Sequence, residues 1–283
     1  MSLPAVSAGW RTGSEIVRVP GWSQFPWLRA GFSTRLGGES TVYGEGELNL
    51  GWTAEDDPAV VSRNRTRFAQ TVAAGTELPL VTVRQVHSPV VRDLEAEPGP
   101  WMTPDRKARM EGDGLISRTP GRLLAVLTAD CMPVLVADTR THAVGAFHAG
   151  WRGTLARIVE RGIAEMKARY DTRPGDLVAA IGPCIGSCCF EVGDEVREQF
   201  AAEFPYAADL FAVPAEGGTR PHMDLVEANR RQLLEAGIAA EKISNLAECT
   251  ACTRQPDGRR RYFSYRSERG ATGRMLSAIG TVG

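Results

Sequence analysis

The sequence contains no long hydrophobic run and no excess of charge of either sign. No apolar stretch approaches the roughly 20 residues that a membrane-spanning helix needs, and the N-terminus lacks the basic-then-apolar order of a signal peptide. The 283 residues include 33 basic and 34 acidic ones, and a net charge of -1 does not favour nucleic acid or an anionic membrane as a partner. We therefore expect a cytoplasmic protein that acts on small molecules. Its oligomeric state stays open.

Internal repeats, low-complexity segments and long linkers are also missing. Gly and Pro are spread as turn residues between short apolar runs. A hydrophobic content of 43% in a chain of 283 residues is sufficient for a large core. We expect a single catalytic domain over residues 1–283.

Short predicted strands and helices follow one another along the chain. Alternating or continuous apolar runs predict strands at residues 32–35, 48–52, 80–86, 123–128, 133–137, 143–147, 177–181 and 275–279. Helical spacing predicts helices at 58–73, from Thr154 as N-cap to residue 170, and at about 194–204 and 224–236. This mixture indicates an α/β (α+β) fold, a layered sandwich of mixed β-sheets flanked by helices.

Histidine is scarce, and two of the four histidines stand where sites are commonly built. His87 and His148 lie at the ends of predicted strands. If Thr139 and Arg140 form a two-residue hairpin loop, Cys131 pairs with His148, and the two Cβ atoms lie about 4.5 to 5.5 Å apart. A thiolate and an imidazole at that separation can share one metal ion, with His87 as a third ligand. Pro133 weakens this register, because proline cannot donate to a strand ladder.

Three ligands of the His, Cys, His type leave a fourth position for water or substrate, as in catalytic zinc sites. No short-range ligand motif supports this set, however. Spacing alone leaves open the more common interpretation, in which Cys131 is a small buried hydrophobe and each histidine an ordinary core or surface residue.

Several motifs in order resemble one known family. They are Gly31-Phe32-Ser33-Thr34-Arg35, Leu48-Asn49-Leu50-Gly51, Arg84-Gln85-Val86-His87-Ser88, Thr128-Ala129-Asp130-Cys131-Met132-Pro133, Phe147-His148-Ala149-Gly150-Trp151-Arg152-Gly153, Ile181-Gly182-Pro183-Cys184-Ile185-Gly186, Phe263-Ser264-Tyr265-Arg266 and Thr272-Gly273-Arg274. The family was formerly called laccase-domain or multicopper polyphenol oxidases. It is now regarded as purine nucleoside phosphorylases with adenosine deaminase activity.

The resemblance implies a fold, a cofactor and an activity. The fold is a layered sandwich similar to that of toxin-like cysteine hydrolases. His87, Cys131 and His148 match the positions that bind a catalytic zinc. The implied enzyme converts adenosine, inosine or guanosine and phosphate to the free base and ribose-1-phosphate, and deaminates adenosine. Methylthioadenosine is left open as a further substrate.

Phosphorolysis also requires groups that bind the anion and the nucleoside. Arg35 lies in a Gly-rich loop, Arg152 just before a predicted helix N-terminus, and Arg266 in a segment flanked by aromatic residues, so these three are candidates for phosphate binding. Asn49, within the second motif, is a further candidate for substrate binding. Any of these arginines could equally form a surface ion pair.

An acid must exchange a proton with the purine. Asp113 lies between two glycines, and Asp130 precedes Cys131. Strand alternation directs Asp130 away from the face that Cys131 uses, so Asp113 is preferred. The alternative for Asp113 is an ordinary turn residue.

Two other enzyme classes remain as alternatives. A multicopper oxidase needs more imidazoles than His87, His142, His148 and His222 provide. One copper bound by His, Cys and His could still support polyphenol oxidation, although Met132 is poorly placed as an axial ligand. A metal-free hydrolase would use Cys131 as nucleophile and His148 as base.

The other five cysteines have two interpretations. Cys249 and Cys252 have the spacing of zinc ligands and, with two of Cys184, Cys188 and Cys189, could form a four-thiolate structural site. A lone CxxC is common, and inert buried thiols account for these positions as well. We prefer inert thiols.

Overall fold

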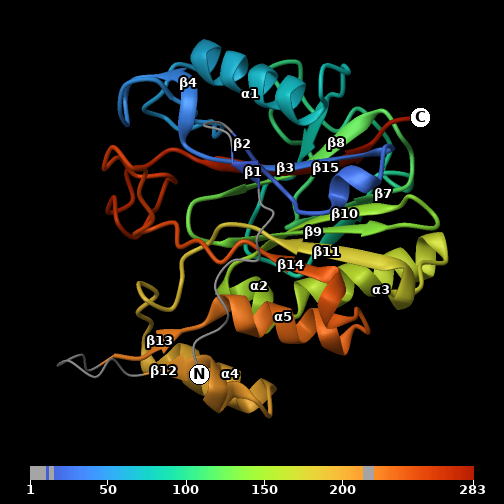
Figure 1. Cartoon of the computed structure of the whole chain (residues 1–283), viewed down its shortest axis with the longest axis vertical. Coiled ribbons are helices and arrows are strands. Elements are labelled where there is room, and N and C mark those ends of the chain that lie inside the picture. Colours follow the sequence, from blue (N-terminus) through green and yellow to red (C-terminus); the bar gives the residue numbers. More distant parts are fainter. Residues whose placement is uncertain (1–10, 13–15, 213–219) are drawn as a thin grey trace.

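The computed structural model describes residues 11–12, 16–212 and 220–283, and its elements form four layers (Figure 1). Two six-stranded sheets face each other. Helix α1 (Pro58–Val72) covers the outer face of the first sheet, and helices α2 (Trp151–Leu155), α3 (Ile158–Tyr170) and α5 (Leu225–Glu235) lie on the outer side of the second (Figure 1). The expected layered α/β fold with mixed sheets is confirmed.

Each sheet mixes parallel and antiparallel neighbours. The first has the order β1 (Arg11–Thr12), β2 (Ile16–Arg18), β3 (Leu28–Ser33), β15 (Met275–Thr281), β8 (Arg122–Thr128) and β5 (Leu80–Thr82). The second has the order β14 (Ile243–Asn245), β11 (Leu177–Ile181), β9 (Met132–Asp138), β10 (Val144–Ala149), β7 (Gly114–Ser117) and β6 (Val91–Asp93). The remaining elements are β4 (Leu36–Ser40), β12 (Phe211–Ala212), β13 (His222–Met223), α4 (Asp194–Glu203) and four short 3-10 turns.

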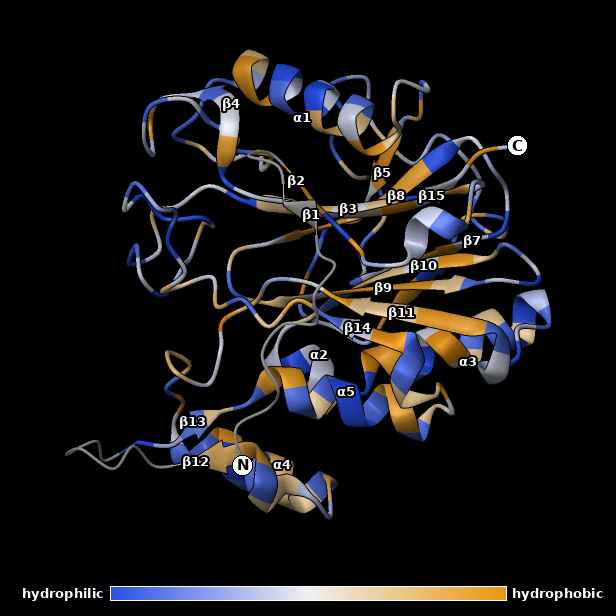
Figure 2. Cartoon of the chain, in the orientation of Figure 1, coloured by the Kyte–Doolittle hydropathy of each residue, from blue (hydrophilic) through white to orange (hydrophobic). Residues whose placement is uncertain are grey.

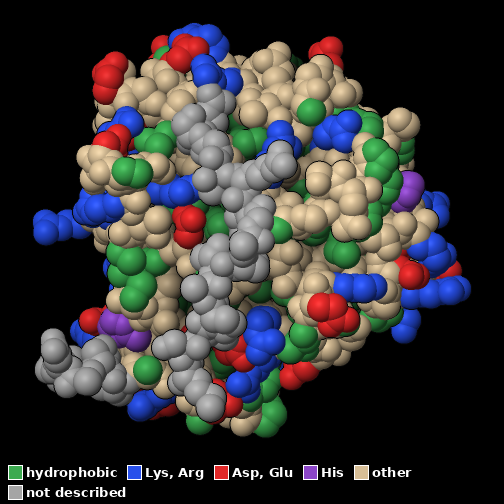
Figure 3. Space-filling model, viewed as in Figure 1, with side chains coloured by type: hydrophobic (Ala, Val, Ile, Leu, Met, Phe, Trp, Pro, Cys, Tyr) green, Lys and Arg blue, Asp and Glu red, His purple; other side chains and the backbone are tan. Residues whose placement is uncertain are grey.

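The central strands are buried on both faces, which explains their nearly continuous apolar sequences. On β9, Leu135 and Ala137 face the first sheet, whereas Val134 and Val136 face the helices. Figure 2 shows apolar residues concentrated in these strands and on the helix faces turned toward them. No helix in the described part of the chain has the length and apolar character to cross a membrane. Basic and acidic side chains are interspersed over the face drawn in Figure 3.

Two predicted elements are wrong. Residues 48–52 form a buried loop, because the N–H of Leu50 donates to Arg274 and its side chain packs with α1. The helix predicted from Thr154 to residue 170 is two helices. Arg157, with a φ of 59°, separates α2 from α3, and α2 begins at Trp151.

The predicted hairpin forms, but its register differs from the prediction by two residues. His148 pairs with Pro133, and Val144 with Ala137. The turn is longer than expected because Asp138 accepts hydrogen bonds from the N–H groups of Arg140 and Thr141. A shift of two residues keeps each side chain on its original face. The expected approach of Cys131 and His148 therefore survives the error.

Candidate metal centre and substrate cavity

The crossing between the two sheets brings Cys131 to the site. Strand β8 of the first sheet ends at Thr128 and β9 of the second begins at Met132, so Cys131 lies where the chain passes between them. Residue Asp130 makes the turn with a φ of 98°. His148 comes from β10, the neighbour of β9, and His87 from the loop that follows β5.

The structure brings together the three residues that the sequence singled out. One potential ligand atom from each of His87, Cys131 and His148 lies within 4.8 Å of the others. Cys131 Sγ is 3.8 Å from His87 Nε2, and the two imidazole rings have centroids 5.0 Å apart. Bond lengths of about 2.3 Å to sulfur and 2.0 to 2.1 Å to nitrogen give a tetrahedral S to N separation of about 3.6 Å. The donor set and its spacing therefore fit a transition-metal ion.

Gly150 keeps the space beside these ligands open. A Cβ at this position would lie 2.8 Å from Cys131 Sγ and 3.3 Å from His87 Cδ2. The first of these distances is shorter than contacts that real Cβ atoms make. Any side chain at position 150 would therefore crowd the cluster.

Asp113 positions both histidines from a fully buried place just before β7. Its Oδ1 lies 2.8 Å from His148 Nδ1 and accepts from the backbone N–H of His87 at 3.0 Å. Its Oδ2 accepts from the N–H and hydroxyl of Ser88 and from the N–H of Val86. Because the carboxylate holds the proton on Nδ1, Nε2 of His148 is left to face Cys131. Carboxylates commonly orient metal-binding histidines in this way.

The same contacts change the acidity of the cluster. Burial opposes ionisation of Asp113, but the hydrogen bonds from His148 and Ser88 lower its pKa to about 2. Burial would raise the pKa of Cys131, yet the positive charge of His148 and hydrogen bonds from both histidines lower it to about 6. Burial would lower the pKa of His148, whereas Cys131 and Asp113 raise it to about 9. A thiolate and an imidazolium thus face each other at neutral pH.

The cluster lines a cavity of about 1050 Å³. Aromatic rings of Trp52, Phe190 and Tyr265 contribute to its walls. Its cationic side chains are Arg84, Lys107, Arg266 and Arg274. Of these aromatic and cationic residues, only Arg266 was a candidate from the sequence, because the others lie on loops far apart in the chain.

The cavity cations differ in how well they are neutralised. Arg84 pairs with Glu111, and Lys107 pairs with Asp105. Arg266 donates only to the carbonyl of Glu191, and neither it nor Arg274 pairs with a carboxylate of the described residues. These two guanidinium groups are therefore the cavity's available anion-binding groups.

Two expected substrate-binding residues have structural roles instead. Arg35 is 4% exposed, pairs with Glu47 and Glu268, and lies over the ring of Phe263 rather than in the cavity. Asn49 is fully buried, and its amide holds Gly51 and Arg274 in place. Neither residue lines the cavity, because a motif in sequence does not show which way its polar residues point.

The positions of Arg152 and Asp130 relative to the cavity also differ from those expected from the sequence. Arg152 is exposed, lies over the ring of Trp151 and does not line the cavity. Asp130 does line the cavity, but both of its oxygens are occupied, by the hydroxyl of Thr250 and the N–H of Arg266. Glu55, which accepts from Tyr43, is the other carboxylate among the lining residues.

Known proteins resemble this chain in sequence. Residues 29–282 match the family described as multi-copper polyphenol oxidoreductase laccase. A purine nucleoside phosphorylase of Deinococcus radiodurans is 39% identical over 88% of this chain and 87% of its own. Adenosine deaminase RL5, from an unknown prokaryotic organism, is 37% identical over 66% of this chain and 71% of its own.

A solved structure has the same fold. YlmD from Geobacillus stearothermophilus superposes with a TM-score of 0.81 and 33% identity, over 97% of this chain and 99% of that one. The chain is therefore an enzyme, and it belongs to the family described as multi-copper polyphenol oxidoreductase laccase, whose similar members include proteins named purine nucleoside phosphorylase and adenosine deaminase.

Proposed function

We propose that this chain is a zinc-dependent purine nucleoside phosphorylase with adenosine deaminase activity. The observation that carries the proposal is the His87, Cys131 and His148 cluster, which opens into a cavity with aromatic walls and unpaired guanidinium groups. A planar base can stack on the aromatic walls, and a phosphate can pair with the guanidinium groups. The names of the similar proteins add support.

Each part of the cavity has a proposed role. His87, Cys131 and His148 would hold zinc, which supplies Lewis acidity when bound. Phe190 and Tyr265 would stack against the purine ring. We retain Asp113 at the site, but as a positioning residue, because a buried carboxylate with a pKa of about 2 is a poor proton donor. We assign the proton transfer, which the sequence favoured for Asp113, to Glu55, a carboxylate that lines the cavity.

Phosphate binding is assigned to Arg266, and its removal should weaken phosphate binding selectively. Arg266→Met keeps most of the side-chain volume but loses the charge. Hydrogen bonds to charged groups contribute about 1.5 to 3 kcal/mol, so the KM for phosphate should rise roughly 10- to 100-fold. Arg152→Met is the matched control, because Arg152 is an exposed arginine within a motif but outside the cavity. Equal effects of both changes in steady-state kinetics would contradict the assignment.

Product analysis tests the activity itself. The purified protein is incubated with inosine, guanosine or adenosine, with and without inorganic phosphate, and the products are separated by chromatography. We expect free base and ribose-1-phosphate only when phosphate is present, and inosine from adenosine without it. Absence of every product in protein that contains stoichiometric zinc would reject the proposal.

Metal binding should release a proton. With pKa values of about 6 for Cys131 and about 9 for His148, the metal-free site holds its proton on His148 at pH 7. Because a ligand must lose that proton, the apparent zinc affinity should rise about tenfold per pH unit from pH 6 to 9 and then level off. Calorimetric titrations at several pH values measure this, with Cys131→Ala as the control. An affinity independent of pH over that range would be incompatible with the proposed ligands.

A metal-free cysteine hydrolase is the second candidate, and one observation favours it. Asp113, His148 and Cys131 are arranged as acid, base and thiolate, as in cysteine nucleophile enzymes. A chelator distinguishes the candidates. Phosphorolysis should stop on zinc removal and return on zinc addition, whereas a cysteine nucleophile would keep its activity and be alkylated at Cys131. Oxidation of a phenol after copper loading would instead support the oxidase alternative.

A further inference from the structure

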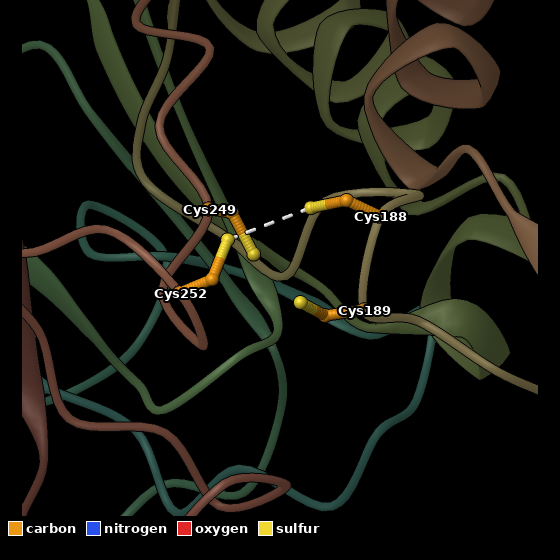
Figure 4. A group of neighbouring side chains, drawn as sticks. All are labelled: Cys188, Cys189, Cys249 and Cys252. Atoms are coloured by element: carbon orange, nitrogen blue, oxygen red, sulfur yellow. Dashed lines mark hydrogen bonds between the residues drawn. The ribbon is translucent and has the colours of Figure 1, made fainter.

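Four cysteines outside the cavity form a second cluster. The Sγ atoms of Cys188, Cys189, Cys249 and Cys252 all lie within 4.8 Å of one another, and Figure 4 shows them turned toward the space between them. The sulfurs of Cys188 and Cys252 are 3.6 Å apart. Four thiolates at about 2.3 Å from a tetrahedral zinc ion lie about 3.8 Å from one another. We propose that these four cysteines bind a structural zinc ion, separate from the ion at His87, Cys131 and His148.

Two loops supply the ligands, and backbone bonds already hold the loops together. The turn after Gly186 brings both neighbouring cysteines to the cluster, since the N–H of Cys189 donates to the carbonyl of Gly186. Cys249 and Cys252 come from the loop after β14. The N–H of Thr250 donates to the carbonyl of Cys184, which joins the two loops beside the sulfurs.

The surroundings favour a thiolate at Cys249. The N–H of Gly186 donates to Cys249 Sγ at 3.2 Å, as backbone groups do toward a charged sulfur. A Cβ at Gly186 would approach both Cys188 Sγ and Cys249 Sγ at less than 4 Å. The guanidinium of Arg260 donates to the carbonyl of Ala251, between the last two ligands, where it can offset the negative charge of a four-thiolate site.

Two members of the cluster differ from Cys184 in their exposure. Cys188 and Cys252 are exposed, so inert burial does not account for them. Cys184 is only 2% exposed, and burial raises its pKa well above the usual range. Inert thiols were expected at all five positions; Cys184, which is buried and outside the cluster, fits that expectation.

The consequence of a metal here is a fixed cavity wall. Ile185 and Phe190, on the first cysteine loop, line the cavity. The N–H of Ile185 donates to the carbonyl of Asp130, and the hydroxyl of Thr250, on the second loop, donates to its carboxylate. Both loops therefore donate hydrogen bonds to Asp130, the residue that precedes Cys131. A zinc ion that joins them would brace the wall of the cavity without contacting substrate.

Metal content in variants tests the second site directly. The Cys131→Ala chain lacks a ligand of the first cluster, so it should retain one zinc per chain, while wild type holds two. Adding Cys188→Ser and Cys252→Ser should remove that last zinc, and adding Cys184→Ala, the matched control, should not. Cobalt in place of zinc in the Cys131→Ala chain should give the near-ultraviolet thiolate-to-metal absorption of a four-thiolate site.

A second measurement uses the unaltered chain, in case the variants fold poorly. In the zinc-loaded protein, the exposed Cys188 and Cys252 should resist a thiol reagent until a chelator removes the metal, and the melting temperature should then fall. A Cys131→Ala chain purified under reducing conditions without zinc would overturn the proposal. So would a Cys188 to Cys252 disulfide in metal-loaded wild type, detected by its mass.

Discussion

Replacement of Cys131 by alanine should nearly abolish phosphorolysis. The change removes the one thiolate ligand of the proposed zinc ion, and Lewis-acid stabilisation of a transition state is worth several kcal/mol. At about 1.4 kcal/mol per factor of ten, we expect kcat/KM to fall by roughly a thousandfold or more. The measurement is steady-state phosphorolysis of inosine, with zinc counted on the same sample.

The thermal stability of the Cys131→Ala chain distinguishes catalysis from scaffolding. Cys131 is only half-buried, so the melting temperature should change little when turnover is lost. Cys184→Ala is the control, because it removes a buried thiol from outside both clusters and should leave kcat/KM unchanged. Unfolding of the Cys131→Ala chain with full specific activity in its folded fraction would mean that the site serves only stability.

Substitution of Asp113 by asparagine should weaken zinc binding and the fold together. The new amide keeps the size of the side chain but brings its own N–H groups against the N–H donors of residues 86–88. Loss of an orienting carboxylate typically costs 10- to 100-fold in metal affinity or activity. Loss of hydrogen bonds to a buried charge should lower the free energy of unfolding by about 1.5 to 3 kcal/mol.

A buried carboxylate elsewhere provides the control for this prediction. Asp56 is 6% exposed and accepts from Ser40 and Asn49, so Asp56→Asn should reduce stability while zinc affinity stays unchanged. The pH adds a further check. Because the pKa of Asp113 is lowered to about 2 in the folded chain, its contribution to stability is present above about pH 4 and is lost as the pH falls toward 2. Zinc affinity unaffected by Asp113→Asn would contradict the positioning role.

The sequence was sufficient to predict the layers and the meeting of two site residues, for a physical reason. Strand periodicity fixes which face a side chain occupies, and an error of two residues in the hairpin register preserves that face. Cys131 and His148 therefore met although the predicted turn was too short. His87 was brought in by the family resemblance, since no local pattern shows that a loop after β5 folds back onto β10. The extent of the domain stays a prediction.

The anion-binding residues were harder to predict, because the direction in which a side chain points, and not the residue's position in a motif, decides its role. Arg35 and Arg266 both stand in motifs, yet only Arg266 reaches the cavity, whereas Arg35 is held by two carboxylates. Arg274 lines the cavity but carried no signal beyond its place in a motif. The cysteine cluster shows the same limit: spacing suggested Cys249 and Cys252, but only the folded loops show which other thiols join them.

The central claim is that His87, Cys131 and His148 hold the zinc ion on which phosphorolysis depends. Anomalous X-ray diffraction at the zinc edge, from crystals of protein that is active in solution, tests it most directly. We predict a peak about 2.0 to 2.3 Å from Nε2 of His87, Sγ of Cys131 and Nε2 of His148. Absence of a peak between these three atoms in crystals of fully active enzyme would contradict the account.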